Sequence, residues 1–111
     1  MKTNDFLEGD VVVIEISGKI MGGDEITRFH GLLHQHLEAR KTRFLIDLDK
    51  VTWSNSLGLG MFIAALASVQ KAQGKMVLAN VTNIEALLAM TKLVRVFDSY
   101  DSREEAMKAL A

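Results

Sequence analysis

Short apolar runs alternate with helix-length segments along this chain, and that alternation limits the fold more than any other feature. The runs are residues 11–16, 44–48 and 76–79. Their content of valine, isoleucine and leucine is typical of buried strands. Because a helix-length segment separates each run from the next, the strands should lie parallel and be joined by right-handed crossovers. The sequence therefore predicts an α/β domain.

The remaining elements follow from turn and capping signals. Residues 6–16 predict a hairpin that turns at Gly9–Asp10, and residues 17–19 are expected to end its second strand. Acidic residues in a first turn and two capping boxes mark three helix starts. The expected helices run from Gly22 to the exit at Lys41, from Leu57 to about Gln73, from Thr82 to about Lys92 and from Ser102 to Leu110, and a last short strand covers Val94–Phe97.

One domain is expected over residues 1–111, since a chain of this length usually builds a single core. Apolar residues make up 49% of the chain, which is enough for a hydrophobic interior. The predicted architecture is a small mixed sheet of four or five strands with about four helices.

Composition excludes several function classes. The chain carries 13 basic and 14 acidic residues, so no excess of positive charge favours a nucleic acid. The lack of cysteine removes disulfides, thiolate metal sites and a cysteine nucleophile. The strongly apolar stretch Leu57–Ala67 is far shorter than the roughly 20 residues of a membrane span. No signal-peptide pattern opens the chain, so a cytoplasmic protein is expected.

Ser56 is the most chemically defined position. It lies between an apolar strand and an apolar helix with a glycine-rich first turn. Its hydroxyl is a candidate N-cap, a role that Ser54 and Asn55 could equally fill. It is also a candidate phosphorylation site, because a helix N-terminus tolerates or favours added negative charge. Such a modification would leave the fold intact and act on whatever docks against the helix.

Catalytic interpretations of this turn are weak. A nucleophile elbow requires glycine where Ser54 stands, and the histidines all fall on the first helix. The turn also lacks the lysine and the spacing of a phosphate-binding loop. An enzyme is therefore not expected, and no cofactor is indicated.

The second helix lacks a polar face. Leu59, Phe62, Ile63 and Leu66 share one stripe that should face the sheet, and the opposite stripe is small or flexible and uncharged. The helix is therefore either sandwiched between the sheet and the third helix or used for docking. The predicted partner-binding residues are Asn55, Ser56, Leu57, Gly58, Gly60, Met61, Ala64, Ala65 and Ser68, with Lys19 and Met21 from the preceding loop.

Three other features are open to a functional interpretation. His30 and His34 have the spacing of two metal ligands on a helix, but no third ligand is evident, and no metal is expected. Asp47 and Asp49 alternate on a strand, where they are either a Mg²⁺ pair or solvated acids. Trp53 is either a lid on the core or a contact anchor.

Five segments, in the expected order, resemble the STAS domain family, and within it the stand-alone anti-sigma-factor antagonists of bacteria. They are Ile16–Ile20, Leu45–Leu48 followed by Val51, Asn55–Gly60, Gly74–Leu78 and Leu93–Phe97. The resemblance implies a small sheet with helices on one side. It also implies binding to an anti-sigma factor that is a serine kinase of the histidine-kinase-like ATPase type.

In that family, phosphorylation of the serine in an Asp-Ser-Ser-Gly turn releases the complex, and a serine phosphatase resets it. The resemblance places that serine at Ser56, with Asn55 and Leu57 replacing the aspartate and the second serine. Asn55 keeps the ability to form Asx-type turn hydrogen bonds.

The leading hypothesis is a partner-switching regulator controlled at Ser56. The alternative is a constitutive STAS subunit of a signalling or lipid-transport assembly, which needs the same surface but not the hydroxyl. A third hypothesis is a small-molecule or nucleotide sensor that uses residues 17–23.

Overall fold

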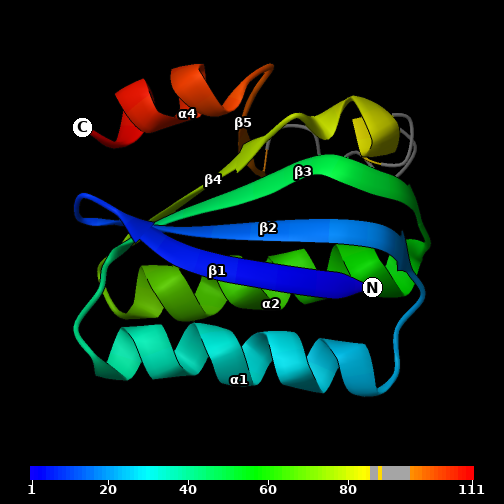
Figure 1. Cartoon of the computed structure of the whole chain (residues 1–111). Helices are drawn as coiled ribbons and strands as arrows, with labels where there is room; N and C mark the ends of the chain where they lie inside the picture. The colour runs from blue at the N-terminus through cyan, green and yellow to red at the C-terminus, as the bar shows by residue number, and fades with distance from the viewer. Residues whose placement is uncertain (86–87, 89–95) are drawn as a thin grey trace.

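The computed structural model describes residues 1–85, 88 and 96–111, and Figure 1 shows its elements. In chain order these are β1 (Lys2–Glu8), β2 (Val11–Ile20), α1 (Asp24–Glu38), β3 (Arg43–Ser54), α2 (Ser56–Lys71), β4 (Lys75–Ala79), a 3-10 turn η1 (Val81–Ile84), β5 (Asp98–Tyr100) and α4 (Arg103–Leu110).

The five strands form one mixed sheet in the order β1-β2-β3-β4-β5. β1 runs antiparallel to β2, which confirms the predicted hairpin, and the other neighbours are parallel. The three apolar runs pair as predicted, since Ile14 lies opposite Ile46 and Ile46 lies opposite Leu78. The hairpin turns through Gly9, whose φ of 61° is a left-handed conformation that glycine adopts without steric cost.

Successive side chains of the central strands point to opposite faces, and each face has its own core. Val12, Ile14, Phe44 and Ile46 belong to the large core, which α1 and α2 cover. The other face carries Val13, Leu45 and Val77, which pack with Ala106 and Leu110 of α4. Figure 1 shows α1 and α2 below the sheet and α4 above it.

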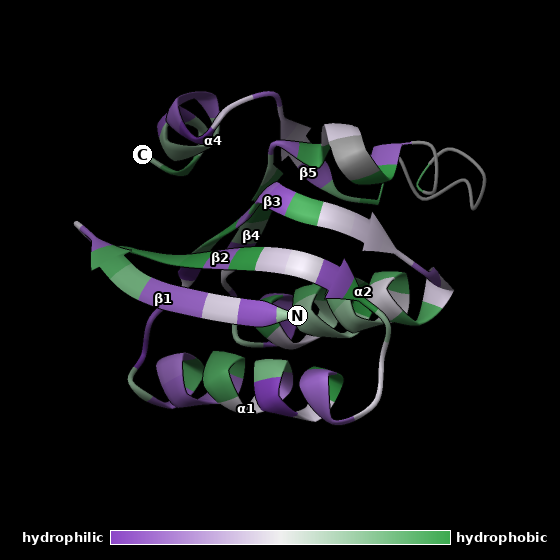
Figure 2. Ribbon diagram, turned by 45° about the vertical axis from the view of Figure 1, so that its right-hand side comes forward, coloured by the Kyte–Doolittle hydropathy of each residue, from purple (hydrophilic) through white to green (hydrophobic). Residues whose placement is uncertain are grey.

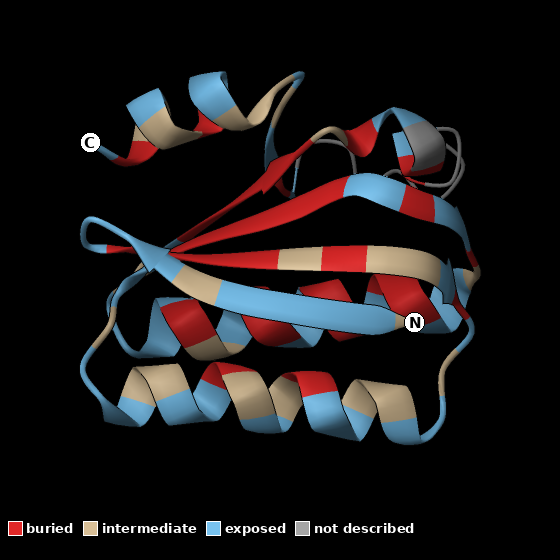
Figure 3. Cartoon of the chain, in the orientation of Figure 1, coloured by how far each residue is buried: buried red, intermediate tan, exposed pale blue. Residues whose placement is uncertain are grey.

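The position of α4 corrects the expectation that helices cover one side only. The first halves of β2 and β3, and β4 after Lys75, are largely apolar on both faces, so both faces need cover. Figure 3 shows the consequence, with these parts of β2, β3 and β4 largely buried and β1 largely exposed. In Figure 2, α1 is banded in purple and green, as expected for a helix with one face in solvent.

Two strands extend beyond their predicted ends. β2 continues through Ser17–Lys19 to Ile20, and its register against β3 shifts between Glu15 and Ser17 and again between Gly18 and Lys19. β3 continues to Ser54, so Trp53 lies in a strand and not in a turn. Ser17–Lys19, which were expected to end the strand, are instead accommodated by these local shifts in register. They lie in the half of the sheet that α4 does not cover, so polar residues are tolerated on that face.

The chain after β4 differs most from prediction. η1 begins at Val81, one residue before the predicted cap Thr82, and most of the helix expected there falls outside the described residues. The predicted strand Val94–Phe97 also lies partly outside them. The strand is instead the polar segment Asp98–Tyr100, and Phe97 just before it is buried in the large core, which explains the misleading apolar pattern.

Candidate functional site

Asn55, and not Ser56, caps α2. The side-chain Oδ1 of Asn55 accepts a hydrogen bond from the Gly58 backbone N–H at 3.0 Å. Ser54 points inward, and its hydroxyl donates to the Asn55 carbonyl at 3.1 Å. Ser56 is exposed, and its hydroxyl makes no hydrogen bond with any other residue in the described part of the chain. Of the three candidate residues, Asn55 is therefore the N-cap of α2, and the Ser56 hydroxyl is left accessible.

The outward stripe of α2 differs from the predicted one. Met61 and Ala65 were expected outside, but they are only 1% and 0% exposed. Ile63 was expected to face the sheet and is 38% exposed. The reason is α1, whose Phe29 packs edge-on against Phe62 of α2 with ring centroids 6.2 Å apart. The predicted outward positions of Met61 and Ala65 are therefore wrong, because α2 packs against both the sheet and α1. Most of the third helix, which was the predicted cover of α2, lies outside the described residues.

The two glycines of the first turn of α2 have different environments. Gly58 is buried, and a Cβ there would lie 2.6 Å from Cγ2 of Ile20, so close packing against β2 requires glycine. Gly58 was predicted as a partner-binding residue, but its burial leaves it no side of its own to offer a partner. Gly60 is exposed, and a Cβ there would meet nothing within 4 Å. A helical glycine costs roughly 1 kcal/mol relative to alanine, and nothing within the described structure requires it at this position.

Several exposed, uncharged residues lie on the first turns of α2 and at the nearby end of β2. Met21 and Leu57 are 59% and 60% exposed, although both are large and apolar. Leu57 lies against the connection between β2 and α1. A Cβ placed on Gly22 of that connection would be 3.0 Å from Cδ1 of Leu57. We name this area the Ser56 surface, and its members are Met21, Ser56, Leu57, Gly60 and Ala64.

The remaining predicted contact residues lie elsewhere. Trp53 is 49% exposed, so the lid interpretation is wrong, and it pairs in register with exposed Lys19 on β2. Ser68 is half-buried in a groove that His34 and Leu37 of α1 also line, two turns further along α2.

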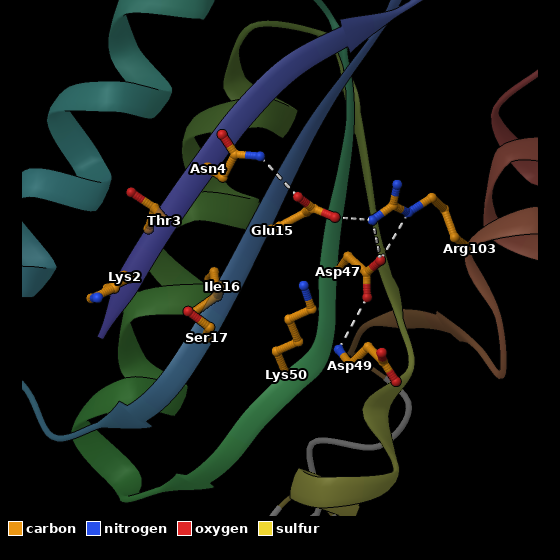
Figure 4. Close-up of a pocket in the computed structure, with 10 residues that line it drawn as sticks. All are labelled: Lys2, Thr3, Asn4, Glu15, Ile16, Ser17, Asp47, Asp49, Lys50 and Arg103. Carbon is orange, nitrogen blue, oxygen red and sulfur yellow. Dashed lines mark hydrogen bonds and ion pairs between the residues drawn. The ribbon is translucent and has the colours of Figure 1, made fainter.

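A second polar cluster lies on the face of the sheet that carries α4. A cavity of about 370 Å³ lies beside this cluster and is lined in part by Glu15, Asp47 and Arg103. Figure 4 shows the side chain of Arg103 reaching from α4 toward Glu15 and Asp47. Arg103 Nε donates to Asp47 Oδ2 at 2.9 Å, and its Nη2 donates to Glu15. Asn80 and the backbone N–H of Asp49 donate to Asp47 Oδ1 at 2.9 and 3.0 Å. We call this network the Arg103 clasp.

The clasp shifts the titration of its carboxyl groups. Burial by itself would raise the pKa of Asp47, but hydrogen bonds from Asn80, the Asp49 amide and Arg103 outweigh it and lower the pKa. Hydrogen bonds from Asn4 and then from Arg103 lower the pKa of Glu15. Both groups are therefore held as carboxylates.

The clasp is a structural element, and the sequence contained a signal for it. The Asp47 oxygens already accept these hydrogen bonds, which does not favour the predicted alternative of a Mg²⁺ pair with Asp49. Arg103 stands in the first turn of α4, where the helix dipole disfavours a cation. A cation in an unfavourable position suggests an acidic partner elsewhere, and only the tertiary structure identified Glu15 and Asp47.

The histidines of α1 have neighbours other than metal ligands. In the described part of the chain, no group of three or more histidine or acidic side chains could hold a metal ion. His30 packs edge-on against Phe29, and burial, followed by the neighbouring His34, lowers its pKa. His36 pairs with Asp5 of β1 at 2.8 Å.

Residues 6–99 of the chain match the family described as "Mlab, STAS domain". The chain belongs to the STAS domain family. The five-stranded sheet and its helices agree with this assignment. A search of curated proteins found no match for this STAS domain. No helix among its described residues is long and apolar enough to cross a membrane.

Solved structures share the fold of this STAS domain. A Thermotoga maritima protein is 22% identical, with a TM-score of 0.86 over 97% of this chain and 93% of its own. An anti-sigma factor antagonist from Mycobacterium paratuberculosis is 20% identical, with a TM-score of 0.82 over 98% and 92%. The phosphorylated form of the Bacillus cell fate determinant SpoIIAA is 13% identical, with a TM-score of 0.76 over 99% and 100%.

Proposed function

We propose that this STAS domain is an anti-sigma-factor antagonist that binds an anti-sigma factor with serine kinase activity through the Ser56 surface. The kinase, of the histidine-kinase-like ATPase type, phosphorylates Ser56 and thereby ends the complex, and a serine phosphatase restores it. Asn55, Ser56, Leu57, Gly60 and Ala64 of α2 and its cap contribute to binding, with Lys19 and Met21 at the adjoining end of β2.

One observation carries the proposal: the hydroxyl of Ser56 is exposed at a helix N-terminus and is not required to cap the helix. Phosphorylation adds about 1.5 to 2 negative charges at neutral pH. The unpaired N–H groups and the dipole of the first turn of α2 favour that charge, so the fold tolerates it. A partner that buries Met21 and Leu57 beside Ser56 would have to desolvate the phosphate, which opposes binding.

Gly60 supports the assignment of this surface. It faces open space, and its lack of a side chain lets a partner approach the helix backbone closely. Gly31 on α1 provides a matched control, because it is also a helical glycine with nothing within 4 Å of its Cβ position. Glutamine at either position improves helix propensity, by up to about 1 kcal/mol.

The test uses the histidine-kinase-like anti-sigma factor of the source organism, ATP and intact-mass spectrometry. We expect one phosphate on the wild type and none on Ser56→Ala, which should still bind. Ser56→Asp should bind at least about tenfold more weakly, or 1.4 kcal/mol, with an unchanged melting temperature. Gly60→Gln should weaken binding and Gly31→Gln should not. Wild-type affinity in the Ser56→Asp variant would refute the switch.

The alternative is a constitutive subunit of a signalling or lipid-transport assembly. The observation that favours it is that Asn55 and Leu57 flank Ser56. The turn that is phosphorylated in the anti-sigma-factor antagonists has aspartate and serine at these two positions. For this function, Ser56→Ala should behave as wild type in cells, whereas Leu57→Arg should be inactive. Leu57 is a suitable test position because it is exposed, whereas a substitution of buried Met61 would disturb the core.

A further inference from the structure

Asn55 joins two segments that lie far apart in the chain. Its backbone N–H donates to the Ile20 carbonyl at 3.2 Å. Its side-chain Nδ2 donates to the Met21 carbonyl at 3.0 Å, while its Oδ1 accepts from Gly58. One residue therefore caps α2 and also holds two consecutive carbonyl groups at the end of β2.

The chain beyond Met21 then passes directly over the first turn of α2. Gly22 has a φ of 103°, in the region that favours glycine, and a Cβ there would lie 3.0 Å from Leu57 Cδ1. Gly22, the residue that follows Met21, therefore lies against Leu57, although the two segments are far apart in the sequence. The exposed fractions of Met21 and Leu57, 59% and 60%, are unusually high for large apolar side chains.

We infer that Asn55 is a positioning residue. Its side-chain amide group, by donating to the Met21 carbonyl, holds Met21 and Leu57 in one continuous apolar surface. The consequence for binding rests on the proposed function, because the same partner must contact both segments at once. That partner is a protein that contacts this area with apolar groups, since none of the five residues of the Ser56 surface is charged. Preorganisation of the two segments spares the partner the entropy cost of ordering them.

Two substitutions separate the capping role of Asn55 from its clamping role. Aspartate and serine both cap helices about as well as asparagine. A carboxylate has no hydrogen to donate to the Met21 carbonyl, and it would place two acceptor oxygens against each other. Serine is uncharged and too short to span from the cap to Met21. Asn55→Asp and Asn55→Ser therefore remove the clamp while keeping the cap, and only one of them adds charge.

The first test needs no partner. In the wild type we expect a nuclear Overhauser contact between the Gly22 Hα protons and the Leu57 methyl groups. In both variants this contact should disappear, while amide exchange at Gly58 stays within about threefold of wild type because the cap persists. Ser56→Ala is the neighbouring control and should retain the contact. If both variants keep it, the clamp is refuted whatever the protein binds.

The second test measures affinity for the anti-sigma factor used above. Both variants should bind about tenfold more weakly than wild type, and the equal effect of neutral serine excludes a charge effect. Wild-type affinity in both variants would refute the positioning role, and the proposed function would stand if Leu57→Arg still abolished binding. A wild type that binds no anti-sigma factor would refute the proposed function alone, since the first test decides the clamp independently.

Discussion

Replacement of Arg103 by methionine tests how α4 is held on the sheet. The side chain of Arg103 links α4 to Asp47 of β3 and to Glu15 of β2. Its guanidinium also lies 5.6 Å from the centre of the Phe6 ring. Methionine keeps the length and most of the apolar stem, so Arg103→Met removes the charge and its hydrogen bonds without opening a large cavity.

The expected loss follows from the exposure of each group. Breaking a fully buried ion pair costs about 3–5 kcal/mol. The side chain of Asp47 is nearly fully buried, at 6% exposed. Asp47 nevertheless keeps its hydrogen bonds from Asn80 and the Asp49 amide. The side chains of Glu15 and Arg103 are 28% and 33% exposed, so solvent screens the attraction between them and reduces its contribution to stability. We expect a free energy of unfolding lower by about 2 kcal/mol.

Urea unfolding of wild type and variant between pH 3 and pH 7 measures this loss. The folded-state pKa values of Asp47 and Glu15 are lowered, so their stabilisation is present above the usual carboxyl range and disappears as the pH falls through the folded values. The difference between the two proteins should be largest near pH 7 and shrink below about pH 4. Lys108→Met, an exposed charge on the same helix, should cost less than about 1 kcal/mol. A loss for Arg103→Met that equals the Lys108→Met loss, or that does not change with pH, would contradict the clasp.

Three further substitutions test local packing and capping. Gly58→Ala should lower the free energy of unfolding by about 2 kcal/mol, because its Cβ would lie 2.6 Å from Cγ2 of Ile20; an unchanged urea midpoint would show that β2 yields easily. Ser56→Ala should change that free energy by less than about 0.5 kcal/mol, and a larger loss would mean that the hydroxyl is structural. Ser102→Ala should cost about 1 kcal/mol through its lost cap on α4, seen as a lower thermal midpoint.

The sequence alone predicted most of the fold because its signals are local. Apolar runs with helix-length separations determined the parallel strands, and the Gly9 turn determined the hairpin. The capping box at Ser102 correctly predicted the start of α4, whose cap bond from the Glu105 amide is 3.1 Å. Family motifs around Ser56 likewise directed attention to the end of β3, where the hydroxyl is indeed exposed.

What covers each surface was decided by the tertiary structure. Met61 and Gly60 are adjacent in the sequence and similar in lacking charge, but α1 buries one side of α2 and leaves the other open. The periodicity of a single helix reports one buried face and cannot report a second helix packed beside it. The contacts of Asn55 with Met21 and of Arg103 with Asp47 span 34 and 56 positions, and no local pattern encodes such distances. They form only when the chain has folded, because the sheet itself brings these residues together.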